Sequence, residues 1–224
     1  RYNIGNQTFE QVFVFCLDDV SEETTIKSRG DAIQPDFVKL PIYYGTDRNF
    51  KSNESNLNYV FGAERAKLSY GVVEVSIPHD HKIGEIETPS IWKFEFSEDP
   101  SKHVMLQGIK RLRKKKFFSK LSQDISNSDK KNTFLFVHGY NTSFSEAAKR
   151  TAQISYDLKF DGKAVFYSWP SQASTFLYRT DERNIAWSSK NLELFLEDYL
   201  SISEAKEIYL IAHSMGNRSL TQAI

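Results

Sequence analysis

The second half of the chain alternates short apolar runs with amphipathic segments, and this order constrains the fold more than any other feature. The apolar runs of strand length are residues 133–137, 164–167 and 207–212. Continuous runs of this kind are typical of strands that are buried on both faces of a parallel sheet. Helical spacing follows Ser143, begins again at about Asp181 and returns near Gly216. The pattern predicts an α/β fold with a mostly parallel sheet, right-handed crossovers and helices on both faces.

The first half of the chain is less regular. We expect residues 1–36, which contain one strand-like run at 12–15, to be an N-terminal extension or linker, and residues 37–224 to form the α/β domain. Within that domain the patterns predict four elements before the regular half and one long connection. These are strands at 38–44, 71–77 and 91–96, a long loop at 49–69 and a strongly basic helix at 104–125.

Composition excludes some classes of protein. Lys and Arg together number 29, as do Asp and Glu, so the net charge is zero, whereas a nucleic-acid module needs a basic surplus. Cys16 is the single cysteine, which allows no internal disulfide and gives no metal cluster. No run is long enough to span a bilayer as an integral membrane segment. The compartment and the oligomeric state stay open.

One pentapeptide has the composition that a reactive serine needs. Residues 212–216 (AHSMG) lie between a predicted buried strand and a predicted helix. A serine on such a tight turn must adopt a strained backbone that lifts its hydroxyl off the sheet, as in a nucleophile elbow. The residues two before and two after it must then be small, as Ala212 and Gly216 are. The alternative interpretation is an ordinary strand-to-helix turn whose serine caps the helix.

A second motif changes the weighting between these interpretations. Residues 136–141 (FVHGYN) follow an earlier buried strand, where this kind of fold places a loop that stabilises an oxyanion. We expect the backbone N–H groups of Tyr140 and Met215 to form the oxyanion hole, and one such donor typically contributes ~2.7–4 kcal/mol to catalysis. Ser214 is therefore the candidate nucleophile. This chemistry requires no metal and no cofactor.

Several stretches together resemble an uncharacterised bacterial α/β-hydrolase family of the esterase/lipase superfamily. The resemblance covers about residues 37–224 and lies in residues 43–48 (YYGTDR), 75–78 with His81, Gly84 and Glu87, 136–144 (FVHGYNTSF), 167–171 (YSWPS) and 211–220 (IAHSMGNRSL). It implies a Ser–acid–His triad in that chain order, with the acid and the histidine beyond Ile224. We accordingly expect a fragment that is truncated after the nucleophile turn and inactive by itself, because Ser214 lacks its base.

The leading prediction is a carboxylic-ester hydrolase that acts on a small-molecule or lipid ester through an acyl-enzyme on Ser214. A non-catalytic binding module or pseudoenzyme on the same scaffold is the alternative. A third hypothesis is a membrane-associated interaction protein that uses the basic run 110–116. Such a run is more often the solvated face of a helix, and zero net charge favours this explanation.

Other residues attract attention with less support. We expect His213 to be a packed or hydrogen-bonded core residue and His138 to be structural. Residues 79–81 (HDH) resemble a metal-ligand set but lack a convincing third or fourth ligand. We expect Asp47 and Arg48 to form an ion pair. Trp169 and Tyr178 either line the substrate pocket or pack beneath loops.

Overall fold

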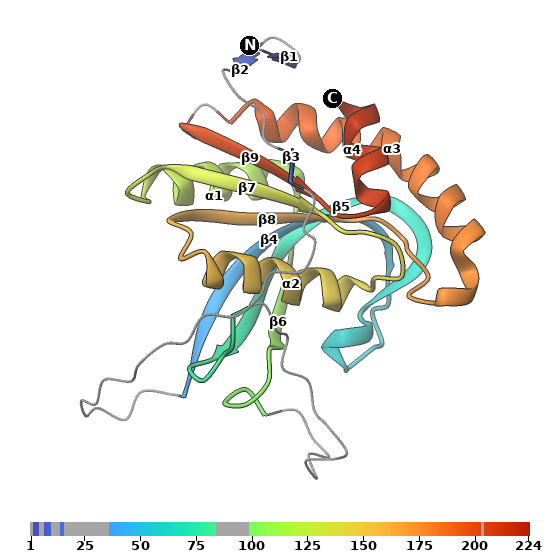
Figure 1. Cartoon of the computed structure of the whole chain (residues 1–224), viewed down its shortest axis with the longest axis horizontal. Coiled ribbons are helices and arrows are strands. Elements are labelled where there is room, and N and C mark those ends of the chain that lie inside the picture. The colour runs from blue at the N-terminus through green and yellow to red at the C-terminus, as the bar shows by residue number, and fades with distance from the viewer. Residues whose placement is uncertain (1, 5–6, 10–13, 16–35, 84–98, 203) are drawn as a thin grey trace.

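A seven-stranded sheet organises the protein (Figure 1). The computed structural model describes residues 2–4, 7–9, 14–15, 36–83, 99–202 and 204–224. In spatial order the strands are β3 (Val14–Phe15), β9 (Glu207–Ala212), β7 (Asn132–Val137), β8 (Gly162–Ser168), β4 (Phe37–Phe50), β5 (Phe61–Pro78) and β6 (Met105–Leu112). Neighbouring strands are parallel except at β5, which is antiparallel to both β4 and β6. A separate antiparallel pair joins β1 (Tyr2–Ile4) to β2 (Gln7–Phe9).

Helices cover both faces of this sheet, as the sequence predicts for the α/β class. They are α1 (Lys114–Ser126), α2 (Phe144–Asp157), α3 (Tyr178–Leu200) and α4 (Met215–Ala223), with short 3₁₀ turns η1 (Leu57–Tyr59) and η3 (Thr175–Leu177). One apolar core lies between the sheet and α2, and a second lies between the sheet and α1, α3 and α4. Figure 1 shows α2 and α3 on opposite sides of the central strands.

Strand alternation explains why the central strands contain continuous apolar runs. In β7, Leu135 and Val137 belong to the core beneath α3, whereas Phe134 and Phe136 belong to the core beneath α2. Successive strand residues point to opposite faces, so a strand covered on both sides needs apolar residues at every position. The side chains of Phe134, Leu135, Phe136 and Val137 are all buried.

The start of α2 follows directly from its sequence. Ser143 Oγ accepts a hydrogen bond from the Glu146 N–H at 3.2 Å, and the Glu146 carboxylate accepts one from the Ser143 N–H at 2.6 Å. This reciprocal pair is a capping box, and it satisfies N–H groups that have no partner within the helix. The cap fixes where α2 begins, and therefore fixes the length of the loop between β7 and α2.

The first half of the chain departs from several predictions. Strand β4 continues through Phe50 instead of ending at Tyr44, and the predicted loop at 49–69 contains η1 and the first half of the antiparallel partner β5. The predicted helix at 104–125 is wrong in its first half, which is strand β6, and only α1 is helical. Pairing between strands that are distant in the sequence determines the secondary structure of these segments, and the local residue pattern does not indicate such pairing. The predicted strand at 91–96 lies outside the described residues.

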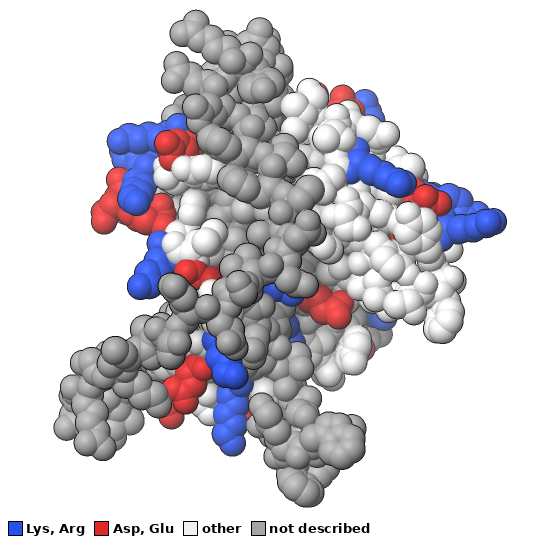
Figure 2. Space-filling view, viewed as in Figure 1, with Lys and Arg blue, Asp and Glu red and all other residues white. Residues whose placement is uncertain are grey.

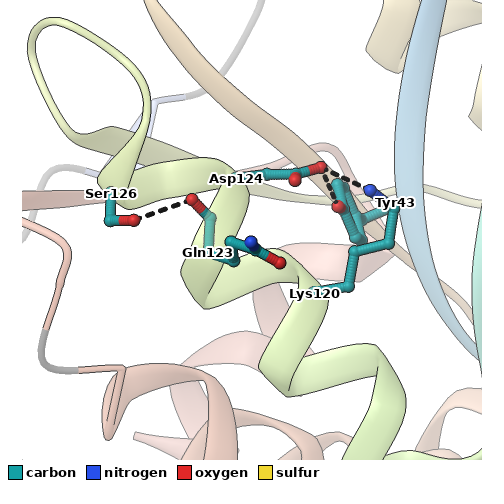
Figure 3. Close-up of polar contacts among 5 residues, drawn as sticks. All are labelled: Tyr43, Lys120, Gln123, Asp124 and Ser126. Atoms are coloured by element: carbon teal, nitrogen blue, oxygen red, sulfur yellow. Dashed lines mark hydrogen bonds and ion pairs between the residues drawn. The ribbon is translucent and has the colours of Figure 1, made fainter.

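Polar contacts fasten α1 to the sheet (Figure 3). Asp124 accepts hydrogen bonds from the Tyr43 hydroxyl on β4 and, at 2.9 Å, from Lys120 Nζ one turn earlier in the helix. Beneath these contacts, Phe117, Leu121 and Ile125 are fully buried against the sheet. The apolar stripe of α1 thus faces the core, and its lysines face solvent.

The segment before residue 37 contributes a strand to the sheet. Val14 pairs with Leu210 and Phe15 pairs with Ile211, both in parallel with β9. The division into an extension at 1–36 and a domain at 37–224 stays a prediction. None of the helices in the described ranges combines the length and the apolar character that a bilayer span requires.

Candidate active site

Three parallel strands end side by side and bring the predicted motifs together. Val137 of β7 pairs with Ala212 of β9 on one side and with Tyr167 of β8 on the other. The His213 N–H then donates to the Val137 carbonyl at 3.1 Å, just beyond the end of β9. The segments that follow these strands consequently leave the same edge of the sheet, where open α/β sheets bind their ligands.

Ser214 occupies a strained turn between β9 and α4. Its backbone has φ 50° and ψ −120°, a conformation that costs a residue with a side chain ~1–3 kcal/mol. The side chain caps no N–H of α4, so the interpretation as a simple capping serine is wrong. The residue is exposed, and its hydroxyl has no hydrogen-bond partner among the described residues.

Two glycines allow the neighbouring segments to approach this turn. A Cβ on Gly139 would lie 2.6 Å from His213 Nδ1 and 2.9 Å from Ser214 Cβ. A Cβ on Gly216 would lie 2.5 Å from the Val137 carbonyl oxygen and 2.7 Å from that of His138. The tight turn predicts small residues at 212 and 216, and the atoms nearest to Gly216 belong to Val137 and His138 at the end of β7. Glycine at 216 therefore packs α4 against β7, and glycine at 139 packs the loop against Ser214.

Two backbone N–H groups without partners among the described residues lie in the segments that meet at this turn. Within the described part of the chain, neither the Tyr140 N–H nor the Met215 N–H donates a hydrogen bond to another group. Tyr140 is held by its side chain, because its hydroxyl donates to the Thr175 carbonyl and its ring contacts Tyr178 edge-on at 5.2 Å. Both N–H groups are thus available to an external acceptor, and their role in an oxyanion hole stays a prediction.

Arg48, on β4, hydrogen-bonds to the loop after β7 and to the end of β8. Its guanidinium is 2% exposed and donates through Nε to Ser168 Oγ at 2.8 Å and through Nη2 to the Thr142 carbonyl at 2.6 Å. Nη1 donates to the carbonyls of Ser171 at 2.9 Å and Gly62 at 3.1 Å. Burial lowers the pKa of Arg48 to about 10, which still leaves it charged at neutral pH. The charge is held by neutral acceptors from four different segments.

His138 is a buried structural residue of the same loop, as predicted. Its ring stacks on Trp169 at 5.0 Å, and Trp169 Nε1 donates to the His138 carbonyl at 2.8 Å. Burial, and next the nearby Arg48 charge, lower the pKa of His138 to about 3, so the imidazole is neutral. Nδ1 lies 2.8 Å from the Gly139 carbonyl and Nε2 lies 3.1 Å from Ser168 Oγ. Since a carbonyl only accepts, we assign the proton to Nδ1.

Asp181, in the first turn of α3, completes the support of this loop. One carboxylate oxygen accepts from Ser171 Oγ at 2.6 Å and from the Asn141 N–H at 3.3 Å, and the other accepts from the Gln172 N–H at 2.8 Å. Asn141 has a positive φ of 54°, which asparagine tolerates better than most residues. The loop is therefore anchored from β4, β8 and α3.

Two predictions are wrong, one about the burial of His213 and one about an ion pair between Asp47 and Arg48. His213 is exposed and not part of the core, because β9 ends at Ala212 and strand alternation does not extend to the next residue. Asp47 and Arg48 form no ion pair with each other, because successive residues of β4 point to opposite faces. Asp47 instead accepts from Ser188 Oγ at 2.6 Å and from Asn191 Nδ2 at 3.0 Å, and burial raises its pKa.

The other candidate residues lie away from this edge or within its scaffold. His81 Nε2 pairs with Asp157 at 2.8 Å, and no group of three or more potential metal ligands occurs among the described residues. Trp169 is fully buried and packs beneath the loop, while Tyr178 is 42% exposed beside Tyr140. The basic run 110–116 is divided between β6 and the start of α1, so it does not form one helix face.

Charge is mixed over the surface that Figure 2 shows. Lysine and arginine side chains lie beside aspartate and glutamate side chains on the described part of that face. Ion pairs among the described residues include Lys114 with Asp198 at 2.6 Å and Arg218 with Glu182 at 3.4 Å. The surface drawn there does not gather one sign of charge into an extended field.

The fold and this strand-to-helix turn define the class of protein. A mostly parallel sheet covered by helices on both faces is the architecture of an α/β hydrolase. Residues 113–224, half of the chain, match the sequence model of a family described as "Alpha/beta hydrolase of unknown function (DUF900)", and the chain belongs to that family. No curated protein and no solved structure matches the chain. The family match includes both loops of the candidate site, while Arg48 lies outside the matched segment.

The sequence identified the candidate residues at this edge of the sheet better than the residues that support them. It singled out Ser214, Tyr140 and Met215, which the fold brings to one edge of the sheet. It did not assign roles in the site to Arg48 or Asp181, or to Ser168. The signal that could have found Arg48 is a lone arginine within an otherwise buried strand, since a buried guanidinium must be surrounded by acceptors.

Proposed function

We propose that this protein is a serine hydrolase that cleaves carboxylic esters through an acyl-enzyme on Ser214. The observation that carries the proposal is the strained, uncapped backbone of Ser214 at φ 50°, with an exposed side chain and, directly after it in the chain, a Met215 N–H without a partner among the described residues. Strain of this kind persists only where the surrounding structure over-determines it, and it clusters at active sites. A serine that served only as a turn residue would have no such conformation to maintain.

The chemistry assigns a role to each group. Ser214 Oγ attacks the acyl carbon as a general base removes its proton, and the carbonyl oxygen becomes an oxyanion that accepts hydrogen bonds from the N–H groups of Tyr140 and Met215. The bond from carbon to the alcohol oxygen then breaks, and the alcohol leaves with the proton. Water attacks the acyl-enzyme in the same manner and releases the acid. The substrate is a small-molecule or lipid ester, and the reaction requires no metal and no redox cofactor.

The position of Ser214 at the start of α4 adds to this stabilisation. Helix N-termini carry a partial positive charge and unpaired N–H groups, and both favour negative charge that develops nearby. The first turn of α4 contains no acidic residue that would compete with an oxyanion. We propose that the general base is a histidine C-terminal to Ile224, which the family's Ser–acid–His order implies.

The test is hydrolysis of p-nitrophenyl esters of graded acyl length by the natural full-length protein. We expect saturable turnover that falls by at least about 10⁴-fold in Ser214→Ala, in line with losses on removing a catalytic serine. Ser122→Ala is the matched control. Ser122 lies on α1 and contacts Glu204, just before β9 begins, whereas Ser214 follows the end of β9. Loss of the Ser122 hydroxyl should leave turnover unchanged.

The outcomes separate the candidate functions. Turnover that Ser214→Ala abolishes while circular dichroism shows an unchanged fold supports the hydrolase. Equal turnover in wild type and Ser214→Ala would exclude Ser214 as the nucleophile. A folded full-length protein that hydrolyses none of the esters would favour a non-catalytic binding module.

A further inference from the structure

In the peptide group between Gly139 and Tyr140, the carbonyl is hydrogen-bonded and the N–H is not, among the residues that the structure describes. Its carbonyl oxygen lies 2.8 Å from His138 Nδ1, which donates to it. Its N–H belongs to Tyr140 and has no partner in the described part of the protein. Because the peptide is planar and trans, carbonyl and N–H point in opposite directions. Fixing the carbonyl on the buried side therefore turns the Tyr140 N–H away from His138.

The alternative orientation of this peptide would be damaging. Gly139 packs directly against the serine, with its Cβ position 2.9 Å from Ser214 Cβ, so the peptide borders the space in which an acyl oxygen would lie. Rotating the peptide by half a turn would present a carbonyl oxygen to that space instead of an N–H. A developing oxyanion would then be repelled, because two acceptors would face each other. Glycine at 139 leaves this rotation sterically easy, so another group must prevent it.

A chain of buried donors extends from Arg48 to this peptide. Arg48 Nε donates to Ser168 Oγ at 2.8 Å, the Ser168 hydroxyl then donates to His138 Nε2 at 3.1 Å, and His138 Nδ1 donates to the Gly139 carbonyl. Each member can donate onward only in this direction, since a guanidinium never accepts and a carbonyl never donates. The arginine, which is charged at neutral pH, thus sets the direction of the whole chain and the tautomer of the imidazole.

The same arginine holds the other end of the loop. Nη2 donates to the Thr142 carbonyl at 2.6 Å, and Nη1 donates to the Ser171 carbonyl at 2.9 Å. A buried guanidinium held by these acceptors cannot move without leaving some of its N–H groups unpaired. The distance between Thr142 and the His138 ring is consequently constrained, and Gly139 and Tyr140 lie between them.

We propose that His138 and Arg48, linked through Ser168, are positioning residues that orient the Gly139–Tyr140 peptide so that the Tyr140 N–H faces the reacting acyl oxygen. This inference rests on the proposed hydrolase function. Neither residue touches the substrate; both act through the loop. Burial lowers the pKa of His138 and keeps the imidazole neutral, which suits this role because a neutral imidazole has one donor and one acceptor.

The test compares two substitutions at one position in the natural full-length protein. His138→Phe keeps a flat ring against Trp169 but removes both nitrogens, while His138→Asn retains an N–H close to the position of Nδ1. Ile125→Ala is the stability control, because it removes buried volume from α1 without touching the loop. The readouts are the rate of Ser214 labelling by a fluorophosphonate, and kcat and KM for an ester.

We expect His138→Phe to lower both the labelling rate and kcat by about 100-fold with KM nearly unchanged, the size of effect seen when one oxyanion donor is lost. His138→Asn should recover at least about a tenth of the wild-type rate, since one donor to the carbonyl remains. Ile125→Ala should label at the wild-type rate although it unfolds at lower denaturant. Wild-type rates in His138→Phe, or equal losses in His138→Phe and His138→Asn, would overturn the inference.

A structural measurement keeps the inference testable if the proposed function fails. Should the wild-type protein show no Ser214-dependent labelling, the hydrolase proposal falls, and a crystal structure of His138→Phe decides the positioning role separately. We expect the Gly139 carbonyl to leave the buried side and the peptide to rotate. An unchanged Gly139–Tyr140 peptide in that variant would show that His138 does not orient it.

Discussion

Ser214 has a strained backbone conformation that its own side chain does not stabilise. The conformation at φ 50° and ψ −120° is one that glycine adopts freely and serine does not, yet serine is present and its side chain makes no compensating cap. The stabilisation must come from the surroundings, where Gly139 and Gly216 let the end of β7 close around the turn. Strain at this position predicts an unusual response to substitution.

Ser214→Gly should therefore raise the free energy of unfolding. Relief of the strained backbone contributes ~1–3 kcal/mol, which exceeds the ~0.5–1 kcal/mol that glycine loses through its freer unfolded chain, so we expect a net gain of about 1 kcal/mol. Urea unfolding measures it. Ser143→Gly is the matched control at a true helix cap and should lower stability by a few tenths of a kcal/mol. Equal losses in both variants would show that Ser214 is an ordinary cap.

Gly139→Ala should damage both the fold and the site. The added methyl would approach Ser214 Cβ to 2.9 Å and the His213 carbonyl to 3.0 Å, neither of which is the flexible end of a side chain. We expect a loss of ~1–3 kcal/mol in unfolding free energy and a fall in fluorophosphonate labelling of at least tenfold. Gly108→Ala, where no atom lies within 4 Å of the new methyl, should change neither. Normal labelling of Gly139→Ala would contradict the close packing of the loop.

At the scale of elements, the N-termini of α1, α2 and α4 differ in their caps and in their charge. The N-terminus of α2 is closed by its capping box, whereas the N-terminus of α4 has no side-chain cap and lies next to an exposed hydroxyl. The N-terminus of α1 is different again. It carries Lys114, Lys115 and Lys116 and no acidic residue, which places positive charge against the positive end of the helix dipole.

Lys116→Glu should consequently stabilise the protein. It replaces an unfavourable charge at the start of α1 with a favourable one and places a carboxylate four residues before Lys120, so we expect a gain of ~0.3–1 kcal/mol at low salt. Thermal unfolding at low and high salt measures it. The same change at Lys120 should have the opposite sign, because it removes the 2.9 Å contact with Asp124. A loss of stability in Lys116→Glu would mean that the lysine cluster makes favourable contacts that the dipole argument omits.

At the scale of the whole molecule, buried polar groups link distant segments. Arg48 on β4 connects the β4–β5 hairpin, the end of β8 and the loop after β7, and Asp181 connects that loop to α3. These segments lie far apart in the sequence, and only the assembled sheet brings them together. Stability of the fold and the geometry of the site therefore depend on the same buried network.

This coupling predicts a specific dependence of stability on pH. In the unfolded chain His138 binds a proton near its ordinary pKa of 6.5, whereas in the folded protein it does so only at about 3. The unfolded state is therefore favoured increasingly as the pH falls through that window, and the unfolding free energy decreases. Urea titrations at pH 7 and pH 4 should show a smaller decrease in His138→Asn than in wild type, although other groups titrate in both. Equal decreases would contradict the burial of a neutral His138.

The sequence predicted the regular half of the fold well and the first half poorly, for physical reasons. Periodicity reports burial, so it located β7, α2, β8 and β9, each of which buries a continuous run or one face against its neighbours. The β4–β5 hairpin contains exposed positions and register shifts near Arg48, which blur any pattern, and β6 follows from its pairing with β5.

The candidate site divides in the same way. Ser214 and Gly139 lie in short motifs whose composition reports a local backbone requirement, and these motifs could be read directly. The contacts of Arg48 with Thr142 and Ser171 span 94 and 123 residues of sequence, and no local pattern encodes them. The ion pair expected between Asp47 and Arg48 was wrong because adjacent strand residues face opposite ways.

The most direct measurement of the central claim is the site of covalent labelling. The natural full-length protein is treated with a fluorophosphonate, digested, and mapped by mass spectrometry, with Ser214→Ala and heat-unfolded protein as controls. Our account predicts a single adduct on Ser214 that is absent from both controls, because only an activated serine beside oxyanion donors reacts at a useful rate. An adduct on another serine, or none on a folded full-length protein, would contradict it.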